Sequence, residues 1–496
     1  MERSDRLTNI PGSCQREKRA RRWGLLLVLC CGGLSVLWGC SIGWNAYKGP
    51  LDFQAVYFGA RTLIEHHDPY IVGELDSVYR VEGGMVQAGD AKQHKLITLF
   101  VNTPGTVLLV APFAVLPLGF AQVLWTILIS GSLVLASVLM WSIAAKHDSM
   151  LSACLIGFLL LNCQVLIAAG NTAAIVVGFA VIATWCFVRD RFVLAGVLCM
   201  AISLAIKPHD TGLVLLYFLL APWPFRKSAI QSGILTAVIT ALAMLWLWSV
   251  APHWMSGWQT NLAAISAPGG MNDPRPGTVV GVGAGNVTSL QAIFSIFSAN
   301  ASFYNTASFA VCGAILVPWA FATFRFRATT TKTWIALAAI APLTMLITYH
   351  RVYDAKLLLL CIPACAMLWA GRGRLGWIAL VLTSAGVVLN ADIPLAVFGI
   401  LIQKLSIPVS TFSGKLLTIL IARPNQEILL AMSVFYLWVY MRRDFAVVRE
   451  DAGDSERELG RSMPRIMQVL DRLYLRAMVT LRPPTRMRCR SGNSNW

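Results

Sequence analysis

Asp52 is the first residue of the sequence whose type and position suggest chemistry. It is the first acidic residue after the apolar run 24–46, and apolar positions recur at helical spacing over residues 52–65. A carboxylate close to a membrane surface can act as a general base toward a hydroxyl. The alternative is structural, because Asp at a helix start often accepts hydrogen bonds from backbone N–H groups.

The turn Thr348–Lys356 is a second polar motif, and it lies between two apolar runs. It contains His350 and Arg351, and the planar fork of donors on an Arg side chain could hold a phosphate or a sugar. The alternative is an ion-pair cluster of Arg351, Asp354 and Lys356 that anchors helix ends, because structural ion pairs produce the same pattern.

Two further polar residues fall at junctions between apolar runs. Lys207, in Ile206-Lys207-Pro208-His209-Asp210, could bind a lipid phosphate as a point charge. The alternative is a lone Lys that snorkels toward water at the membrane interface. Asn171 lies in the polar turn 169–172, which an ordinary tight connection would also explain. The twelve cysteines include no pair with zinc-ribbon spacing, and we expect no metal site.

The elements that must position these residues are membrane helices. Of the 496 residues, 56% are hydrophobic and 13% are charged, about half the charged share of a soluble domain. This composition excludes a soluble enzyme, a disordered tail protein and a coiled coil. A spanning helix needs about 20 mostly apolar residues, and the candidate spans are 24–46, 97–117, 119–142, 150–168, 171–188, 192–206, 211–223, 228–250, 303–324, 334–348, 355–371, 375–391 and 426–441.

One of these segments, 97–117, is a poor candidate for a straight span. It contains Pro104, Gly105, Pro112 and Pro117, which break or kink helices. We therefore expect it to be re-entrant or interfacial, which leaves about twelve spans. The alternative is that it does span and that two short later segments form one helix.

The net charge of +17 follows the positive-inside rule. The basic N-terminus 1–23, the basic tail 442–496 and four short basic connections account for all of it. We therefore expect a protein of the bacterial cell (inner) membrane. These basic segments would lie in the cytoplasm, and the long loops 47–96 and 251–287 would lie outside. The charge then needs no nucleic-acid partner to explain it. In this topology we expect the four polar motifs to face the outer side.

Two segments outside the spans carry expectations of their own. The glycine-rich stretch 268–285 lacks the features of a phosphate-binding loop, and it is either a mobile external lid or a plain disordered loop. The tail 442–496 contains apolar residues near helical spacing among arginines, which predicts an amphipathic helix on anionic lipid. Residues 24–441 then form the transmembrane domain.

Several weak motifs follow one another along the chain. They are Asp52 with Val56-Tyr57 and Ala60, Asp68-Pro69-Tyr70, Asn102-Thr103-Pro104, Ala111-Pro112-Phe113 with Leu116-Pro117, Gly170-Asn171-Thr172, Ala195-Gly196 with Lys207-Pro208, and Tyr349-His350. Their order resembles glycosyltransferase family 87, the polyprenyl-phosphate-mannose-dependent mannosyltransferases of the GT-C class. The resemblance covers roughly residues 20–440, and the chain departs from the family at His66, where Gly is usual, and at Asn171, where Gln is usual.

This resemblance implies an all-α GT-C-like bundle that moves a hexose, in this family mannose, from a polyprenyl phosphate to an acceptor hydroxyl with inversion. Asp52 would be the base, and a glycolipid or glycan would be the acceptor. The donor already carries an activated sugar, so the reaction needs no cofactor or metal. Substrate binding would fall to Tyr57, Asp68, Tyr70, Asn171, Lys207, His350 and Arg351. The rival functions are a transporter or lipid flippase, and a membrane scaffold without catalytic activity.

Overall fold

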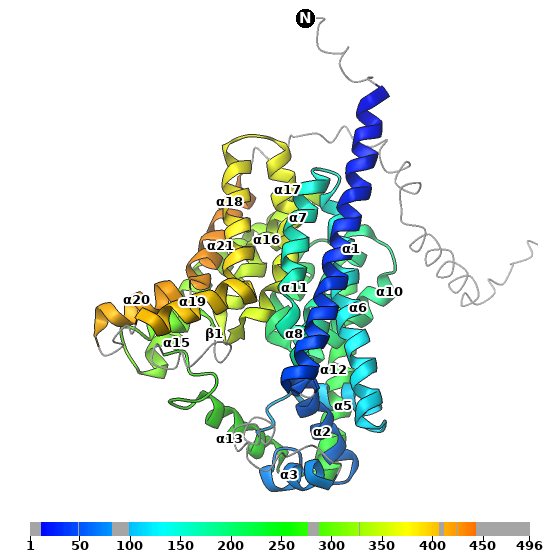
Figure 1. Cartoon of the computed structure of the whole chain (residues 1–496), viewed down its shortest axis with the longest axis vertical. Helices are drawn as coiled ribbons and strands as arrows, with labels where there is room; N and C mark the ends of the chain where they lie inside the picture. Colours follow the sequence, from blue (N-terminus) through cyan, green and yellow to red (C-terminus); the bar gives the residue numbers. More distant parts are fainter. Residues whose placement is uncertain are drawn as a thin grey trace, which may run out of the picture. The chain divides into compact units, whose positions relative to one another are not determined.

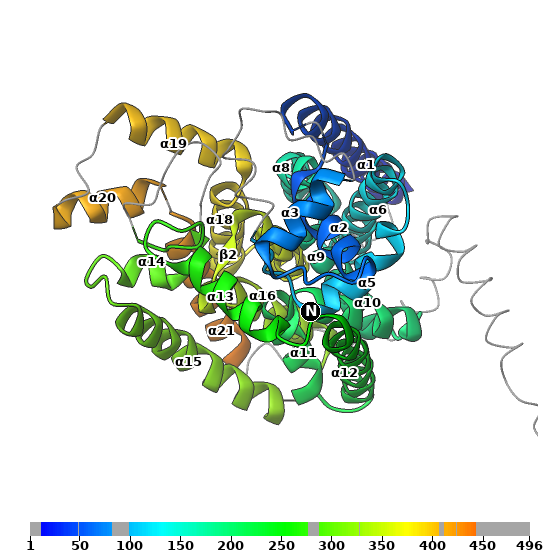
Figure 2. The same ribbon diagram turned by 90° about the horizontal axis from the view of Figure 1, so that it is seen from below.

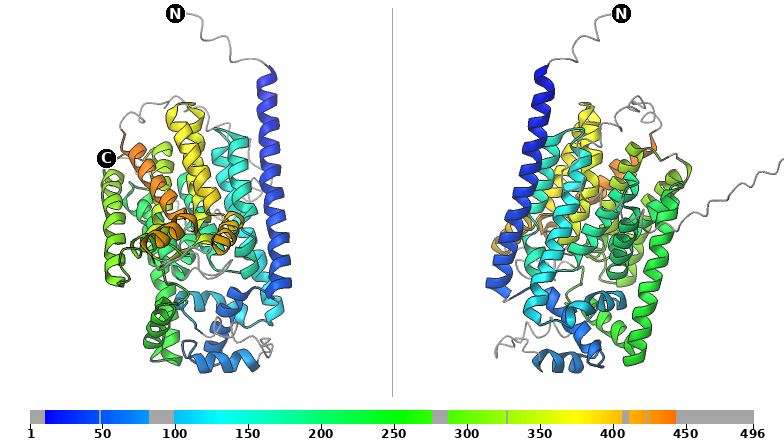
Figure 3. Two further views of the ribbon diagram at one scale, coloured as in Figure 1. Left: turned by 60° about the vertical axis from the view of Figure 1, so that its left-hand side comes forward. Right: turned by 90° about the vertical axis from the view of Figure 1, so that its right-hand side faces the viewer.

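The computed structural model describes residues 11–47, 49–81, 99–275, 287–326, 328–405, 411–422 and 424–442. These residues form a helical bundle, along one side of which α1 (Pro11–Tyr47) runs (Figures 1 and 3). The tail helix expected after residue 442 and residues 276–285 of the glycine-rich stretch lie outside the described residues.

The helices of the bundle coincide with the apolar runs of the sequence. Besides α1, they are α6 (Leu118–Ala144), α7 (Ser149–Leu161), α8 (Gln164–Ala169), α9 (Ala173–Arg189), α10 (Val193–Ile206), α11 (Pro208–Leu220), α12 (Phe225–Val250), α15 (Ala301–Arg325), α16 (Thr330–Ile347), the 3-10 segment η2 (Val352–Leu360) with α17 (Cys361–Ala370), α18 (Arg374–Leu389) and α21 (Asn425–Met441).

Among the described residues, seven helices are long and apolar enough to cross a membrane, and up to eight if the bent pair formed by residues 374–389 and 392–398 is one span. The chain is therefore an all-α, multi-pass membrane protein. The expected number of about twelve is higher because it includes shorter apolar helices such as α9 and α10. Helix α10 stops at Ile206, since the residue before a proline avoids the helical region and Pro208 follows Lys207.

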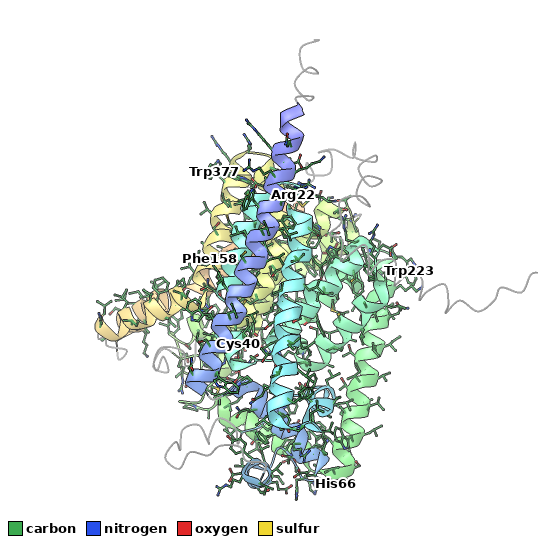
Figure 4. All side chains as sticks on the ribbon, turned by 45° about the vertical axis from the view of Figure 1, so that its right-hand side comes forward. Arg22, Cys40, His66, Phe158, Trp223 and Trp377 are labelled. Atoms are coloured by element: carbon green, nitrogen blue, oxygen red, sulfur yellow. The ribbon has the colours of Figure 1, made fainter. Side chains whose placement is uncertain are left out.

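In the described part of segment 97–117, which begins at residue 99, the only helix is the short α5 (Pro104–Ala114). Its 11 residues are too few to cross a bilayer, which needs about 20. A Cβ on Gly24 of α1 would touch Trp141 and Ser149, so the α6–α7 connection lies near the start of α1. Figure 4 places Arg22 and Trp377 at this end of the bundle and His66 at the opposite end.

Short helices gather at the end that carries His66 (Figures 1 and 2). Helix α2 (Leu51–Ile64) confirms the helix predicted over 52–65, and Asn261 of α13 (Trp254–Ser266) donates to the carbonyls of Tyr70 and Phe100. The remaining elements are α3 (Val72–Val81), α14 (Leu290–Phe294), α19 (Asp392–Leu405), α20 (Phe412–Ala422), β1 (Val287–Thr288) and β2 (His350–Arg351).

Candidate active site

Asp52 lies in the first turn of α2, but it does not cap the helix. Pro50 is the N-cap residue, and the Asp52 carboxylate instead faces the turn between α8 and α9. The side-chain amide of Asn171 donates to Asp52 Oδ2 at 2.5 Å and also lies 3.1 Å from the hydroxyl of Tyr353. The capping explanation of Asp52 is therefore wrong for this helix, and Asn171 does more than connect two helices.

Gly170 allows α2 to approach this turn. Its backbone is left-handed with φ +65°, and a Cβ at this position would lie 2.5 Å from Cβ of Pro50. The indole of Trp125 donates to the Gly170 carbonyl at 2.8 Å and fixes the turn against α6. A residue with a side chain here would push the start of α2 away, so Gly170 permits the contact between Asp52 and Asn171.

Lys207 connects α10 to α11 and is paired with two buried acids. Its ammonium lies 2.8 Å from Asp354 Oδ1 and 3.1 Å from Asp210 Oδ2. The hydroxyl of Thr103, at the start of α5, donates to the carbonyl of Ala205 at 2.8 Å. The Pro-rich segment thus holds the end of α10 in place, and Lys207 is not the lone snorkelling side chain that the alternative supposed.

His350 lies on β2, which is held in place by its pairing with β1. Strand β2 pairs with β1 in antiparallel register, with Thr288 opposite His350. Two side chains of α21 bind β1 in turn, because Asn425 donates to the Thr288 hydroxyl and Gln426 donates to the Val287 carbonyl. Helix α21 and strand β1, whose contacting residues are 137 and 139 positions apart in sequence, therefore fix the place of His350 together.

The two ring nitrogens of His350 have different partners. Nδ1 lies 3.0 Å from the carbonyl of Thr348, and Nε2 lies 3.0 Å from Asp210 Oδ1. The ring of His209 approaches the same carboxylate oxygen, with Nε2 at 3.4 Å. These three side chains are close enough together to hold a metal ion.

Arg351 follows His350 and is oriented by its neighbours. Its guanidinium Nε donates to the hydroxyl of Tyr349, and its backbone N–H donates to Asp354 Oδ2 at 2.8 Å. Asp354 thus pairs with the side chain of Lys207, rather than joining the side-chain cluster with Arg351 and Lys356 that the alternative supposed.

Burial and nearby charge shift the pKa values of Asp52 and His350 in opposite directions. Burial raises the pKa of Asp52 above the usual carboxylate range, although the hydrogen bond from Asn171 and the charges of Arg351 and Lys207 oppose this increase. Burial alone would lower the pKa of His350, but contact with Asp210 raises it overall. A carboxylate with a raised pKa is a stronger base than an ordinary one, which suits proton abstraction.

The three remaining predicted residues are Tyr57 on α2 and Asp68 and Tyr70 in the loop after it. Each of them makes a hydrogen bond within the protein. The hydroxyl of Tyr57 donates to the carbonyl of Leu116 at 2.7 Å, and that of Tyr70 donates to the carbonyl of Asn102 at 2.8 Å. Asp68 accepts from the backbone N–H of Tyr70. These bonds hold the loop after α2 against neighbouring segments, and substrate binding by these residues stays a prediction.

Two residues of the site, Tyr353 and Asp210, belong to the polar motifs of the sequence but were not predicted to have a role. Tyr353 contacts Asn171, and Asp210 contacts both Lys207 and His350. Both sit within three residues of a predicted site residue, and that proximity was the only signal available. The positive-inside rule predicts that all the motifs lie on one side of the membrane, but it carries no information about which side chains meet.

Comparison with known proteins found no family model, no curated protein and no solved structure that matches the chain.

Proposed function

We propose that this protein is an integral membrane glycosyltransferase. In this proposal it moves a hexose, most simply mannose, from a polyprenyl-phosphate donor to an acceptor hydroxyl on the outer face of the membrane. The observation that carries the proposal is the contact between Asp52 and Asn171. In this contact the Asp52 carboxylate binds Asn171 and does not cap α2. It also lies within electrostatic range of the cations Arg351 and Lys207.

The proposed reaction divides between the carboxylate and the cations. The acceptor oxygen attacks the anomeric carbon while Asp52 takes the hydroxyl proton, and a new glycosidic bond forms with inversion. The bond between the anomeric carbon and the phosphate oxygen breaks, and the lipid phosphate leaves with the electron pair. Arg351 and Lys207 supply positive charge that favours the departing phosphate.

The orientation of the chain is part of the same proposal. The N-terminal part of α1 and the turn before α18 lie at one end of the bundle, and both carry basic residues (Figure 4). This arrangement supports a cytoplasmic N-terminus in a bacterial inner membrane protein. The cytoplasmic C-terminus and the number of about twelve passes stay predictions from the sequence. A reporter fused at Lys146 should give a cytoplasmic signal, and one at His66 an external signal; an external signal at Lys146 would contradict the orientation.

Sugar transfer can be tested directly in proteoliposomes that contain the full chain. We expect labelled mannose to move from polyprenyl-phosphate-mannose to a glycolipid acceptor, with release of one polyprenyl phosphate per sugar. The rival function, a transporter or lipid flippase, predicts solute counterflow or lipid movement without a new glycosidic bond. Movement of intact donor across the bilayer with no product would refute the transferase.

A further inference from the structure

His209, Asp210 and His350 form a compact cluster beside Lys207, one of the two proposed cations. Asp210 and His350 have side chains that are 2% and 1% exposed, whereas the side chain of His209 is 34% exposed and opens the cluster on one side. Asp210 Oδ1 lies 3.0 Å from Nε2 of His350 and 3.4 Å from Nε2 of His209. We propose that this cluster is a binding site for a divalent transition-metal ion such as zinc.

The hydrogen bond on the far side of the His350 ring carries the proposal. The Thr348 carbonyl can only accept, so the contact at 3.0 Å places the ring proton on Nδ1. In the neutral ring, Nε2 then presents a lone pair to a carboxylate oxygen. Within the described part of the chain, neither His350 Nε2 nor the Asp210 oxygens have a hydrogen-bond partner of good geometry. A cation between His350 Nε2 and Asp210 Oδ1 would satisfy both atoms, while Oδ2 faces the Lys207 ammonium at 3.1 Å.

The spacing of the three atoms fits a small metal ion. Tetrahedral zinc binds His nitrogen and carboxylate oxygen at about 2.0–2.1 Å, which puts neighbouring ligand atoms about 3.3 Å apart. The measured separations of 3.0 and 3.4 Å are close to this value, and all three ligand atoms lie within 4.8 Å of one another. Two His and one carboxylate leave a fourth position open, which in zinc enzymes takes water or a substrate oxygen.

The surroundings also resemble the second shell of a metal site. A metal-binding His commonly donates its other ring N–H to a backbone carbonyl, as His350 does to Thr348. Lys207 contacts Oδ2 of Asp210 and leaves Oδ1 to the two His rings. Two carboxylates, Asp210 and Asp354, share the single cation Lys207, so a metal ion at the cluster would balance a remaining negative charge.

Metal content tests the site without any assay of sugar transfer. The full chain, purified through a histidine-free tag and stripped with a chelator, should bind about one Zn²⁺ or Co²⁺ per molecule. His209→Ala should weaken binding by tenfold or more, since even second-shell changes cost 10- to 100-fold. Its side chain is partly exposed, so this variant should keep the fold, and His147→Ala, an exposed His outside the cluster, is the matched control.

The outcomes separate the metal site from its alternatives and from the proposed function. Co²⁺ bound by the cluster should also show the visible absorption of a tetrahedral ion, and this absorption should disappear in His350→Ala. Failure of the stripped chain to bind metal would mean that a proton on His350 Nε2 satisfies Asp210 instead. Equal binding by wild type and His209→Ala would place the metal elsewhere. Either result would overturn the metal site and leave the transferase proposal standing.

Discussion

Replacing Asn171 with Asp tests how the proposed base is controlled. Asn171 donates one hydrogen bond to Asp52 and accepts another from the backbone N–H of Ala173 at the start of α9. Asp has the same shape and keeps the acceptor for Ala173, but it loses the donor. It also places a second carboxylate at the position of an amide nitrogen that lies 2.5 Å from Asp52 Oδ2.

The size of the effect follows from the lost bond and the added charge. A hydrogen bond to a charged group contributes about 1.5–3 kcal/mol, which equals about one to two pKa units at 1.36 kcal/mol per unit. Loss of the donor alone should therefore raise the pKa of Asp52 by about one to two units from a value that burial already raises. The neighbouring carboxylate raises it further, because two acids at this distance share one proton.

The assay is the pH dependence of sugar transfer by Asn171→Asp and wild type. The base must be ionised, so the rate rises with pH through the pKa of Asp52, and the variant should need a higher pH by more than one unit. Thermal stability should fall at a pH above the raised pKa of Asp52, where both carboxylates are ionised, and should recover at lower pH, because the bond to Ala173 at the start of α9 is kept. An unchanged pH profile with reduced activity would refute the account, since it would make Asn171 a purely structural residue.

Three further predictions concern the same site. Gly170→Ala should destabilise the fold by about 1–2 kcal/mol for the left-handed backbone alone, with more from the contact with Pro50; an unchanged thermal midpoint would contradict this. Gln426→Leu should lower stability by about 1–3 kcal/mol, because the buried Val287 carbonyl loses its donor; a midpoint equal to that of wild type would argue against the role of α21. In the wild type, the rate of sugar transfer should already decline at a pH above about 4, the usual carboxylate pKa, because burial raises the pKa of Asp52. A constant rate down to that pH would exclude Asp52 as the base.

Much of the helical framework could be predicted from the sequence, because apolar length is a local property. The run over 119–142 predicted α6, and the periodicity after Asp52 predicted α2. The number of spans was harder to predict, since a break at a single residue such as Lys207 decides whether two apolar runs are long enough to cross.

The contacts of the site could not be predicted, because they join residues far apart in the chain. Asn171 meets Asp52 across 119 positions, and Lys207 meets Asp354 across 147 positions. The positive-inside rule placed their motifs on one side of the membrane, but it carries no information about which side chains pair. The glycine that permits the first contact, Gly170, is visible in the sequence only as part of an ordinary turn.

Activity of Asp52→Asn in the proteoliposome transfer assay tests the central claim most directly. General-base catalysis contributes about 10²- to 10⁴-fold, so the variant should transfer mannose at least a hundred times more slowly than wild type. Asp76→Asn, on α3 outside the site, is the matched control and should keep wild-type activity. Asp52→Asn with the same rate as Asp76→Asn would contradict the assignment of the base.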